Sequence, residues 1–448
     1  MSIAHYVVLL GTLVFAGILI CRALSSGSKS EDALADAEQR MRDAGHPVTL
    51  EELNAYYPEV QRDQNTALVY GQAATLLESA DPGRERTNSL FERLKDAEAT
   101  TPIAAELLRE IESHLSACGG VLSALDQALA LQESRYPVDL RRGFSSDLDY
   151  LAPLRSCWRL EALRGALALS RGQSSDFVQS QLSMLHIAGS LRNEPLILSQ
   201  LIRIAGHVEA SIMLAAGLSR HSLTIGELKA LEIAYEDSLA QDAFARAYAG
   251  ELCFVNSGLS RLGGEGFDAD TPEMAALRES ALKTGAPIGN REYSIREQVV
   301  FIEFLGPFAN ASDLTWPERM KLGREVETVV WKLPNSHVDA KDSLPQLLRA
   351  VQAFGREVAM LCTARVALAV ECFRADAGAL PDDLSQLVPK YLPALNADPF
   401  DGQPLRYKRL SNGYQVYSVG EDLKNDGGRQ AERSDFGFLG DWVFEVRR

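Results

Sequence analysis

The residues best suited to chemistry lie in a glycine-rich loop near the end of the chain, at residues 420–440. The loop offers carboxylate and amide oxygens at Asp422, Asn425, Asp426 and Asp435, and Asp441 follows directly after it. Calcium takes roughly six to eight hard oxygen ligands and tolerates flexible geometry. We therefore expect a calcium ion to order this loop.

The loop is not an EF-hand. Counted from Asp422, the third position is Lys424 and the twelfth is Arg433, where that motif needs oxygen ligands. The alternative reading is a solvated acidic loop, whose negative charge Lys424, Arg429 and Arg433 would reduce. Both readings stay open from the residues alone.

The elements that must position this loop can be read from local patterns. Residues 344–377 carry apolar side chains at helical spacing, and Gly378 follows as a typical left-handed end of a helix. Two alternating runs, 405–410 and 414–419, flank Asn412-Gly413, which is a strong hairpin signal. A last strand is expected at residues 441–446. The sequence thus predicts a small antiparallel sheet beside a long helix.

This C-terminal stretch resembles the globular part of the major pseudopilin of type II secretion systems. The matching residues are Gly378-Ala379-Leu380-Pro381, Tyr391-Leu392-Pro393, Asp398-Pro399-Phe400-Asp401-Gly402, and the run from Tyr414 to Asp422. The resemblance implies a calcium site formed by Asp422 and the Val419 carbonyl, with Asp435 or Asp441 as the later carboxylate. The whole chain resembles a group of uncharacterised bacterial proteins that combine a membrane anchor, a helical middle and a pseudopilin-like end.

The N-terminus reads as a membrane anchor. Residues 4–24 are apolar, and about 21 residues in a helix span roughly 31 Å, which is enough for the hydrocarbon core of a bilayer. No Lys or Arg precedes this run and no A-x-A-like site follows it, so we expect an uncleaved, single-pass helix. Arg22 and Lys29 mildly favour a cytoplasmic body. Calcium binding favours the other side, and we expect an extracytoplasmic body.

Net charge and length limit the classes of partner and the number of domains that the chain can have. The 448 residues carry a net charge of −16, which argues against nucleic acid as a partner. We expect a mainly α protein with four parts: an anchor at 1–24, a linker and first helical segment at 25–48, an all-helical body at 49–343, and the long helix with its pseudopilin-like α+β module at 344–448.

The body reads as a helical bundle or a solenoid-like array. Helices are expected at residues 49–57, 66–80, 147–170, 175–192, 195–218, 225–236, 242–262, 291–308, 314–331 and 344–377. Thr49 with Glu52 and Thr224 with Glu227 predict capping boxes, and Pro195 is expected in the first turn of its helix.

Motifs for catalysis or cofactor binding are absent from the sequence. There is no G-x-S-x-G elbow, no Walker loop, no H-E-x-x-H and no C-x-x-C. His186 and His207 are expected to be hydrogen-bonded histidines of the fold, and Glu357, Glu371 and Asp376 to lie on the solvated face of the long helix. A Cys118–Cys157 disulfide is possible, although buried free thiols are commoner.

Three functions remain open from the sequence. The first is a non-enzymatic, membrane-anchored interaction or structural protein, with a protein partner on the helical body and calcium in the C-terminal module. The second is a component of a type II secretion-like apparatus. The third is a hydrolase with an unrecognised site in the helical body. The missing motifs favour the first.

Overall fold

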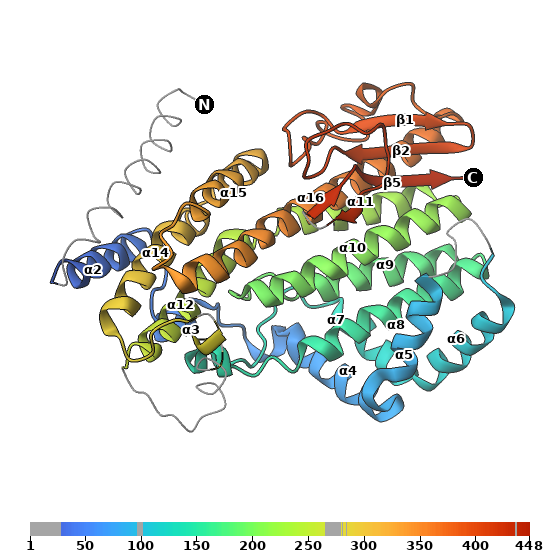
Figure 1. Ribbon diagram of the computed structural model, residues 1–448. Helices are drawn as coiled ribbons and strands as arrows, with labels where there is room; N and C mark the ends of the chain where they lie inside the picture. Colours follow the sequence, from blue (N-terminus) through green and yellow to red (C-terminus); the bar gives the residue numbers. More distant parts are fainter. Residues whose placement is uncertain (1–27, 96–101, 265–278, 280, 284, 435–436) are drawn as a thin grey trace.

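The computed structural model describes residues 28–95, 102–264, 279, 281–283, 285–434 and 437–448 (Figure 1). Within these residues the protein is mainly helical and carries a small antiparallel sheet near its C-terminus. This confirms the predicted fold class in its main features. The predicted anchor at residues 4–24 lies outside the described residues.

Two hydrophobic cores share two long helices. The helices of the first core are α4 (Thr66–Ala80), α5 (Glu85–Lys95), α6 (Ala105–Ala117), α7 (Gly119–Ala128), α8 (Leu151–Ser170), α9 (Ser174–Gly189) and α11 (Ile225–Ala240). Those of the second core are α2 (Ser28–Asp43), α12 (Phe244–Leu262), α14 (Arg291–Ala309) and α15 (Trp316–Val330). A smaller cluster joins α3 (Leu50–Tyr56) to the short helix η3 (Leu140–Ser145). The shared helices are α10 (Ile197–Arg220) and α16 (Val338–Ala377).

Helix α16 is the axis of the fold. Its N-terminal half belongs to the second core and its C-terminal half to the first, and Figure 1 shows it running from α14 and α15 to the sheet. It packs against α14 and α15, which precede it in the chain, and against α10 and α11, which lie about a hundred residues or more earlier. The contacts with α10 and α11 differ from those of a solenoid, in which each unit contacts only its sequence neighbours.

A buried charged cluster joins α10 to α16. Arg203 Nη2 lies 2.9 Å from Glu357 Oε2, and His207 Nδ1 lies 2.6 Å from Glu357 Oε1. None of the three residues is more than 3% exposed. Arg203 Nε also donates to the side chain of Gln200 (2.6 Å), whose amide nitrogen donates to the carbonyls of Leu191 and Glu194. The cluster therefore fixes both helices and the turn that precedes α10.

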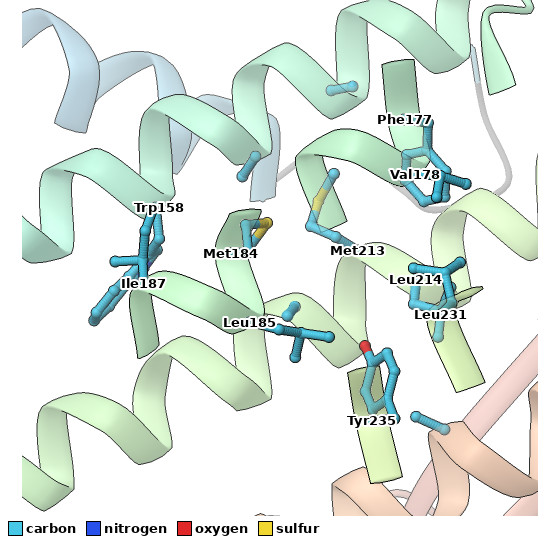
Figure 2. Close-up of a cluster of buried hydrophobic side chains, with 14 of the residues drawn as sticks. Trp158, Phe177, Val178, Met184, Leu185, Ile187, Met213, Leu214, Leu231 and Tyr235 are labelled. Carbon is cyan, nitrogen blue, oxygen red and sulfur yellow. The ribbon is translucent and has the colours of Figure 1, made fainter. Parts of the chain in front are cut away.

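Close packing in the first core depends on glycines that face large side chains. Figure 2 shows Trp158, Phe177 and Tyr235 among the buried side chains of this core. A Cβ at Gly217 of α10 would lie 2.2 Å from Phe177 of α9. These two helices can approach as they do only because Gly217 has no side chain.

The sheet packs directly on α16. Its strands β1 (Arg406–Leu410), β2 (Gly413–Ser418) and β5 (Trp442–Arg447) are antiparallel in the order β1-β2-β5. In the register of β2 with β5, Tyr414 pairs with Val446 and Val416 with Phe444, and all four are buried in the first core. The hairpin at Asn412-Gly413 is confirmed, since β1 and β2 pair up to Leu410 and Gly413. A small hairpin, β3 (Glu432–Ser434) and β4 (Gly437–Leu439), and the short helix η4 (Leu384–Leu387) complete the module.

Three sequence predictions are corrected here. Glu357 and Glu371 do not lie on a solvated face, because they are 2% and 3% exposed; both are paired with cations from other elements, whereas Asp376 is exposed as expected. Pro195 does not lie in the first turn of a helix, because α10 begins at Ile197.

Some element bounds and pairings also differ from expectation. Helix α16 begins at Val338, before the expected start at 344. Pro345 therefore lies inside the helix and not at its beginning. The boundary expected at 343/344 therefore falls within α16. The predicted capping boxes at Thr49 and Thr224 are both confirmed. Cys118 and Cys157 are buried free thiols.

Among the described helices, α10 alone is long and apolar enough to cross a membrane, judged by length and composition. Half of its apolar window is buried inside the protein, and it carries Arg203 and His207 of the charged cluster. These contacts are those of a core helix of a folded body.

The close approach of α12 to the turn before α10 gives a first test. A Cβ at Gly250 would lie 1.6 Å from the carbonyl oxygen of Pro195. We expect Gly250→Ala to lower the free energy of unfolding by about 3 kcal/mol, because a backbone carbonyl cannot move aside as a side chain can. The measurement is urea or thermal unfolding by circular dichroism.

The same substitution at Gly71 is the matched control, because a Cβ there meets nothing within 4 Å. Gly71 lies in α4, so Gly71→Ala should stabilise the protein by about 0.4–1 kcal/mol. Equal effects of the two substitutions would contradict the packing of α12 against Pro195.

Candidate functional site

The loop expected to hold calcium is closed by Asp441. This residue is 0% exposed, and its carboxylate accepts the backbone N–H groups of Asp426 (3.3 Å) and Gly428 (2.7 Å). Its own N–H donates to the Arg429 carbonyl at 2.8 Å. Burial raises the pKa of the Asp441 carboxyl. The carboxylate thus serves as an acceptor for the loop backbone.

The other expected ligands also face hydrogen-bond donors. Asp422 Oδ1 accepts the N–H of Lys424 at 3.1 Å. Asn425 Oδ1 accepts the N–H of Gly427 at 3.0 Å and the Tyr417 hydroxyl at 3.3 Å. Asp426 lies 3.4 Å from Arg429 in an ion pair.

Two expected ligands remain to be placed. Val419 is buried at the end of β2, and its N–H donates to Asp398 at 2.9 Å. Asp435 lies outside the described residues. In the part of the chain that the structure describes, no three His, Cys, Asp or Glu side chains form a group that could hold a metal ion. Nothing in the described residues tests the predicted set, which also includes the Asn425 amide and the Val419 carbonyl, and the calcium site stays a prediction.

Asp398 explains the D-P-F-D-G turn, and sequence reasoning gave it no role. It is 0% exposed and accepts from the N–H groups of Phe400 and Val419, the Ser418 hydroxyl and the Arg406 guanidinium. Burial raises the pKa of its carboxyl. The residue joins the turn to the end of β2, which is a structural task.

A cleft of about 600 Å³ lies where the C-terminal module meets the helical body. We call it the junction cleft. Its walls are the last turn of α16, the β1–β2 hairpin, the end of β5 and the segment after α10. The side chains that could act on a ligand are Glu371, Arg374, Arg409, Tyr414 and Arg448.

Two guanidinium groups share one carboxylate oxygen in this cleft. Glu371 Oε2 lies 2.6 Å from Arg374 Nη2 and 2.7 Å from Arg448 Nη2. Its other oxygen accepts the hydroxyl of Tyr414 at 3.1 Å. Burial and the nearby Glu371 carboxylate raise the pKa of Tyr414, so this hydroxyl remains a donor. Glu371 is buried, while Arg374 and Arg448 each keep about a quarter of the side chain exposed (27% and 25%).

Arg448 also ties the sheet to the body. Its guanidinium donates to the Ser222 hydroxyl at 2.7 Å and to the His221 carbonyl at 3.2 Å, and both residues follow α10. The N–H of Arg447 donates to the Ser219 hydroxyl at 3.1 Å. These contacts hold one wall of the junction cleft against the other.

Arg409 on β1 adds a third cation to the cleft. It pairs with Asp382 at 2.6 Å, and the two side chains are 49% and 78% exposed. An exposed pair of this kind contributes little to stability and is easily exchanged for another partner. The lining therefore holds three cations and one anion.

No local sequence signal identifies the junction cleft. Glu371 and Arg374 are one turn apart on α16, but Arg448 joins them only through the sheet. Comparisons of the chain with protein-family models, with curated proteins and with solved structures find no match.

Asp441 gives the test of how the loop is closed. We expect Asp441→Asn to lower the free energy of unfolding by about 1–3 kcal/mol, because an amide cannot accept both backbone N–H groups. The measurement is thermal unfolding in EDTA, and Asp382→Asn, at an exposed position, is the control with little effect. An unchanged midpoint for Asp441→Asn would contradict this account of the loop.

Calcium is tested separately on the full-length protein. If calcium orders the loop, millimolar calcium raises the melting temperature of the natural protein by mass action and leaves that of Asp422→Ala unchanged. Magnesium at the same concentration controls for ionic strength. A melting temperature that does not respond to calcium in either protein would contradict the predicted site.

Proposed function

We propose that this protein is a membrane-anchored binding protein, and that it holds a carboxylate or phosphate group of its ligand in the junction cleft. The proposal takes the anchor from residues 4–24 and the binding site from the end of α16 and the sheet. It develops the first of the three functions that the sequence leaves open.

The main support for the proposal is that one oxygen of Glu371 pairs with both Arg374 and Arg448. One carboxylate neutralises one of the two guanidinium groups beside it, so a net positive charge remains between Arg374 and Arg448. Burial lowers the pKa of Arg448 because its charged form is partly desolvated. The net charge of the chain is −16, so the positive charge in the cleft is a local exception in an acidic protein.

An oxyanion is the ligand that suits such a cluster. Guanidinium groups donate paired, planar N–H groups that match carboxylate and phosphate oxygens. Arg409 can leave its exposed partner Asp382 and turn to a ligand at the same wall. Carboxylate and phosphate share this chemistry, and the experiment below separates them.

The pseudopilin-like module and its calcium ion enter the proposal as expectations. In this view the module is a rigid support that closes one side of the cleft. The resemblance to a secretion pseudopilin keeps the second function open. In that case the protein would meet its ligand as a component of a type II secretion-like apparatus.

The test compares two substitutions with opposite expected effects. Arg374→Gln removes a donor and should weaken oxyanion binding by about tenfold or more, since a hydrogen bond to a charged group contributes about 1.5–3 kcal/mol. Glu371→Gln removes the competing carboxylate and should strengthen binding. Calorimetric titration of the full-length protein with phosphate and with succinate, at constant ionic strength, measures both.

Arg93→Gln is the matched control, because Arg93 forms an exposed ion pair with Glu110 far from the cleft in sequence. Melting of each variant without ligand shows whether it is folded. A response to phosphate alone or to succinate alone identifies the oxyanion. The proposal fails if neither anion binds, or if folded Glu371→Gln binds no more tightly than the natural protein.

A further inference from the structure

The start of α2 marks the end of the molecule at which the chain enters from the predicted anchor. This helix begins at Ser28, shortly after the anchor expected at residues 4–24. Glu31 in its first turn forms an ion pair with Arg291 at the start of α14, at 3.3 Å. Figure 1 shows α2 and α14 on the side of the molecule opposite the sheet. We call this part of the surface the anchor end.

The start of α16 belongs to the anchor end as well. The Tyr293 hydroxyl, in the first turn of α14, donates to Asp339 at 2.9 Å. His337 Nδ1, just before α16, lies 2.7 Å from Glu297 Oε1 of α14. The link between α15 and α16, residues 331–337, is therefore held at this end.

The most exposed apolar side chains of the described residues gather at the anchor end. Ala281 packs in one apolar cluster with Tyr293, which places the neighbouring Leu282 at this end. Leu282 is 71% and Trp331 63% exposed, and no other large apolar side chain in the described ranges exceeds these values. Val329, in the last turn of α15, is 39% exposed. Single exposed apolar side chains are ordinary, but several at one end of a protein indicate a surface that contacts something apolar.

The link that carries Trp331 suits the boundary between lipid and water. Tryptophan concentrates at membrane interfaces, because its ring is largely apolar and its N–H can still bond to water. Lys332 is exposed and follows directly, and the link contains no carboxylate. Lys283 likewise follows Leu282 and is exposed. A lysine can lay its alkyl stem along apolar surface and keep its ammonium group among the lipid headgroups.

Charge gives the anchor end no particular attraction for acidic lipid. Its exposed ion pairs, Glu31 with Arg291 and Glu279 with Lys283, are neutral as pairs. The exposed Glu292 adds a further negative charge. A contact with lipid at this end therefore depends on apolar area, and neutral lipid suffices for it.

From this arrangement we propose that the anchor end lies on the bilayer surface, with Trp331 and Leu282 inserted among the headgroups of neutral, phosphatidylcholine-type lipid. The inference rests on the membrane anchor of the proposed function and does not depend on the oxyanion site. Two inserted side chains bind lipid weakly by themselves. The anchor makes their contact intramolecular, which raises its effective concentration.

The position of the junction cleft follows from this contact. Val338 at the start of α16 and Glu371 in the cleft are 371 − 338 = 33 residues apart on one helix. At about 1.5 Å per residue, the helix separates them by about 50 Å. The cleft then meets ligands that are dissolved away from the membrane, and lipid headgroups do not reach it.

The first experiment measures tryptophan fluorescence of the full-length protein in phosphatidylcholine vesicles, with and without brominated lipid, which quenches tryptophan on contact. The other tryptophans, Trp158, Trp316 and Trp442, are buried or partly buried against the two cores. We expect brominated lipid to lower the emission of the natural protein. This loss should disappear in Trp331→Phe, which replaces the indole by another apolar ring.

Amide hydrogen exchange gives a second readout. In vesicles, the double variant Leu282→Ser/Trp331→Ser should lose the protection that the natural protein shows over residues 328–336. Ile233→Ser is the matched control, because Ile233 is 56% exposed on α11, which packs against the other half of α16. It should leave the exchange of that segment unchanged. Melting in detergent shows whether each variant is folded, and both inserted positions are exposed enough to accept serine.

Flotation of the vesicles after an alkaline wash reports on the anchor alone. If the protein floats, and brominated lipid quenches the natural protein and Trp331→Phe equally, the inference is overturned while the anchor stands. Protein that does not float overturns the anchor and the inference together. Protection of residues 328–336 in detergent that rises with protein concentration would mean that a second copy of the chain covers the anchor end, which also overturns the inference.

Discussion

The buried pairing of Glu357 with Arg203 and His207 is the interaction on which the rest of the structure depends. The Arg203 guanidinium, the Glu357 carboxylate and the His207 imidazole, whose pKa burial lowers, meet where water is excluded. Removing Arg203 or Glu357 leaves an uncompensated charge in the interior. The cluster fixes α10 against α16 in one register. Both cores contain parts of these two helices, so the positions of the other helices and of the sheet follow from that register.

Elements that depend on nearby residues could be predicted from the sequence. The capping boxes at Thr49 and Thr224 and the hairpin at Asn412-Gly413 each need only a few consecutive residues, and all three are confirmed. The short helices α5 to α7 could not be predicted from the sequence, because an apolar stripe over so few turns is a weak signal. The burial of Glu357 and Glu371 was missed for a different reason. A charged residue on a helix is expected to face solvent unless its partner is known. Here the partners are Arg203 of α10 and Arg448, which follows β5.

The same reason explains why the candidate sites could not be read from the chain. The sequence indicates a metal site in the acidic loop because its oxygens are close together along the chain. In the structure the buried carboxylate of Asp441 instead accepts backbone N–H groups. The junction cleft and the anchor end have no sequence signature, because each combines residues from elements that only the fold brings together. Arg448, which follows the last strand, cannot be recognised as part of a site until the sheet places it beside Glu371. Proximity along the chain thus favoured the loop over both of these sites.

The contacts of Arg447 and Arg448 have a consequence for how the protein can move. The module leaves the body through the unbroken helix α16 and returns to it through Arg447 and Arg448, which bond to Ser219, His221 and Ser222. A segment fastened at both of its ends cannot swing like a flap on a hinge. Module and body should therefore melt as one cooperative unit.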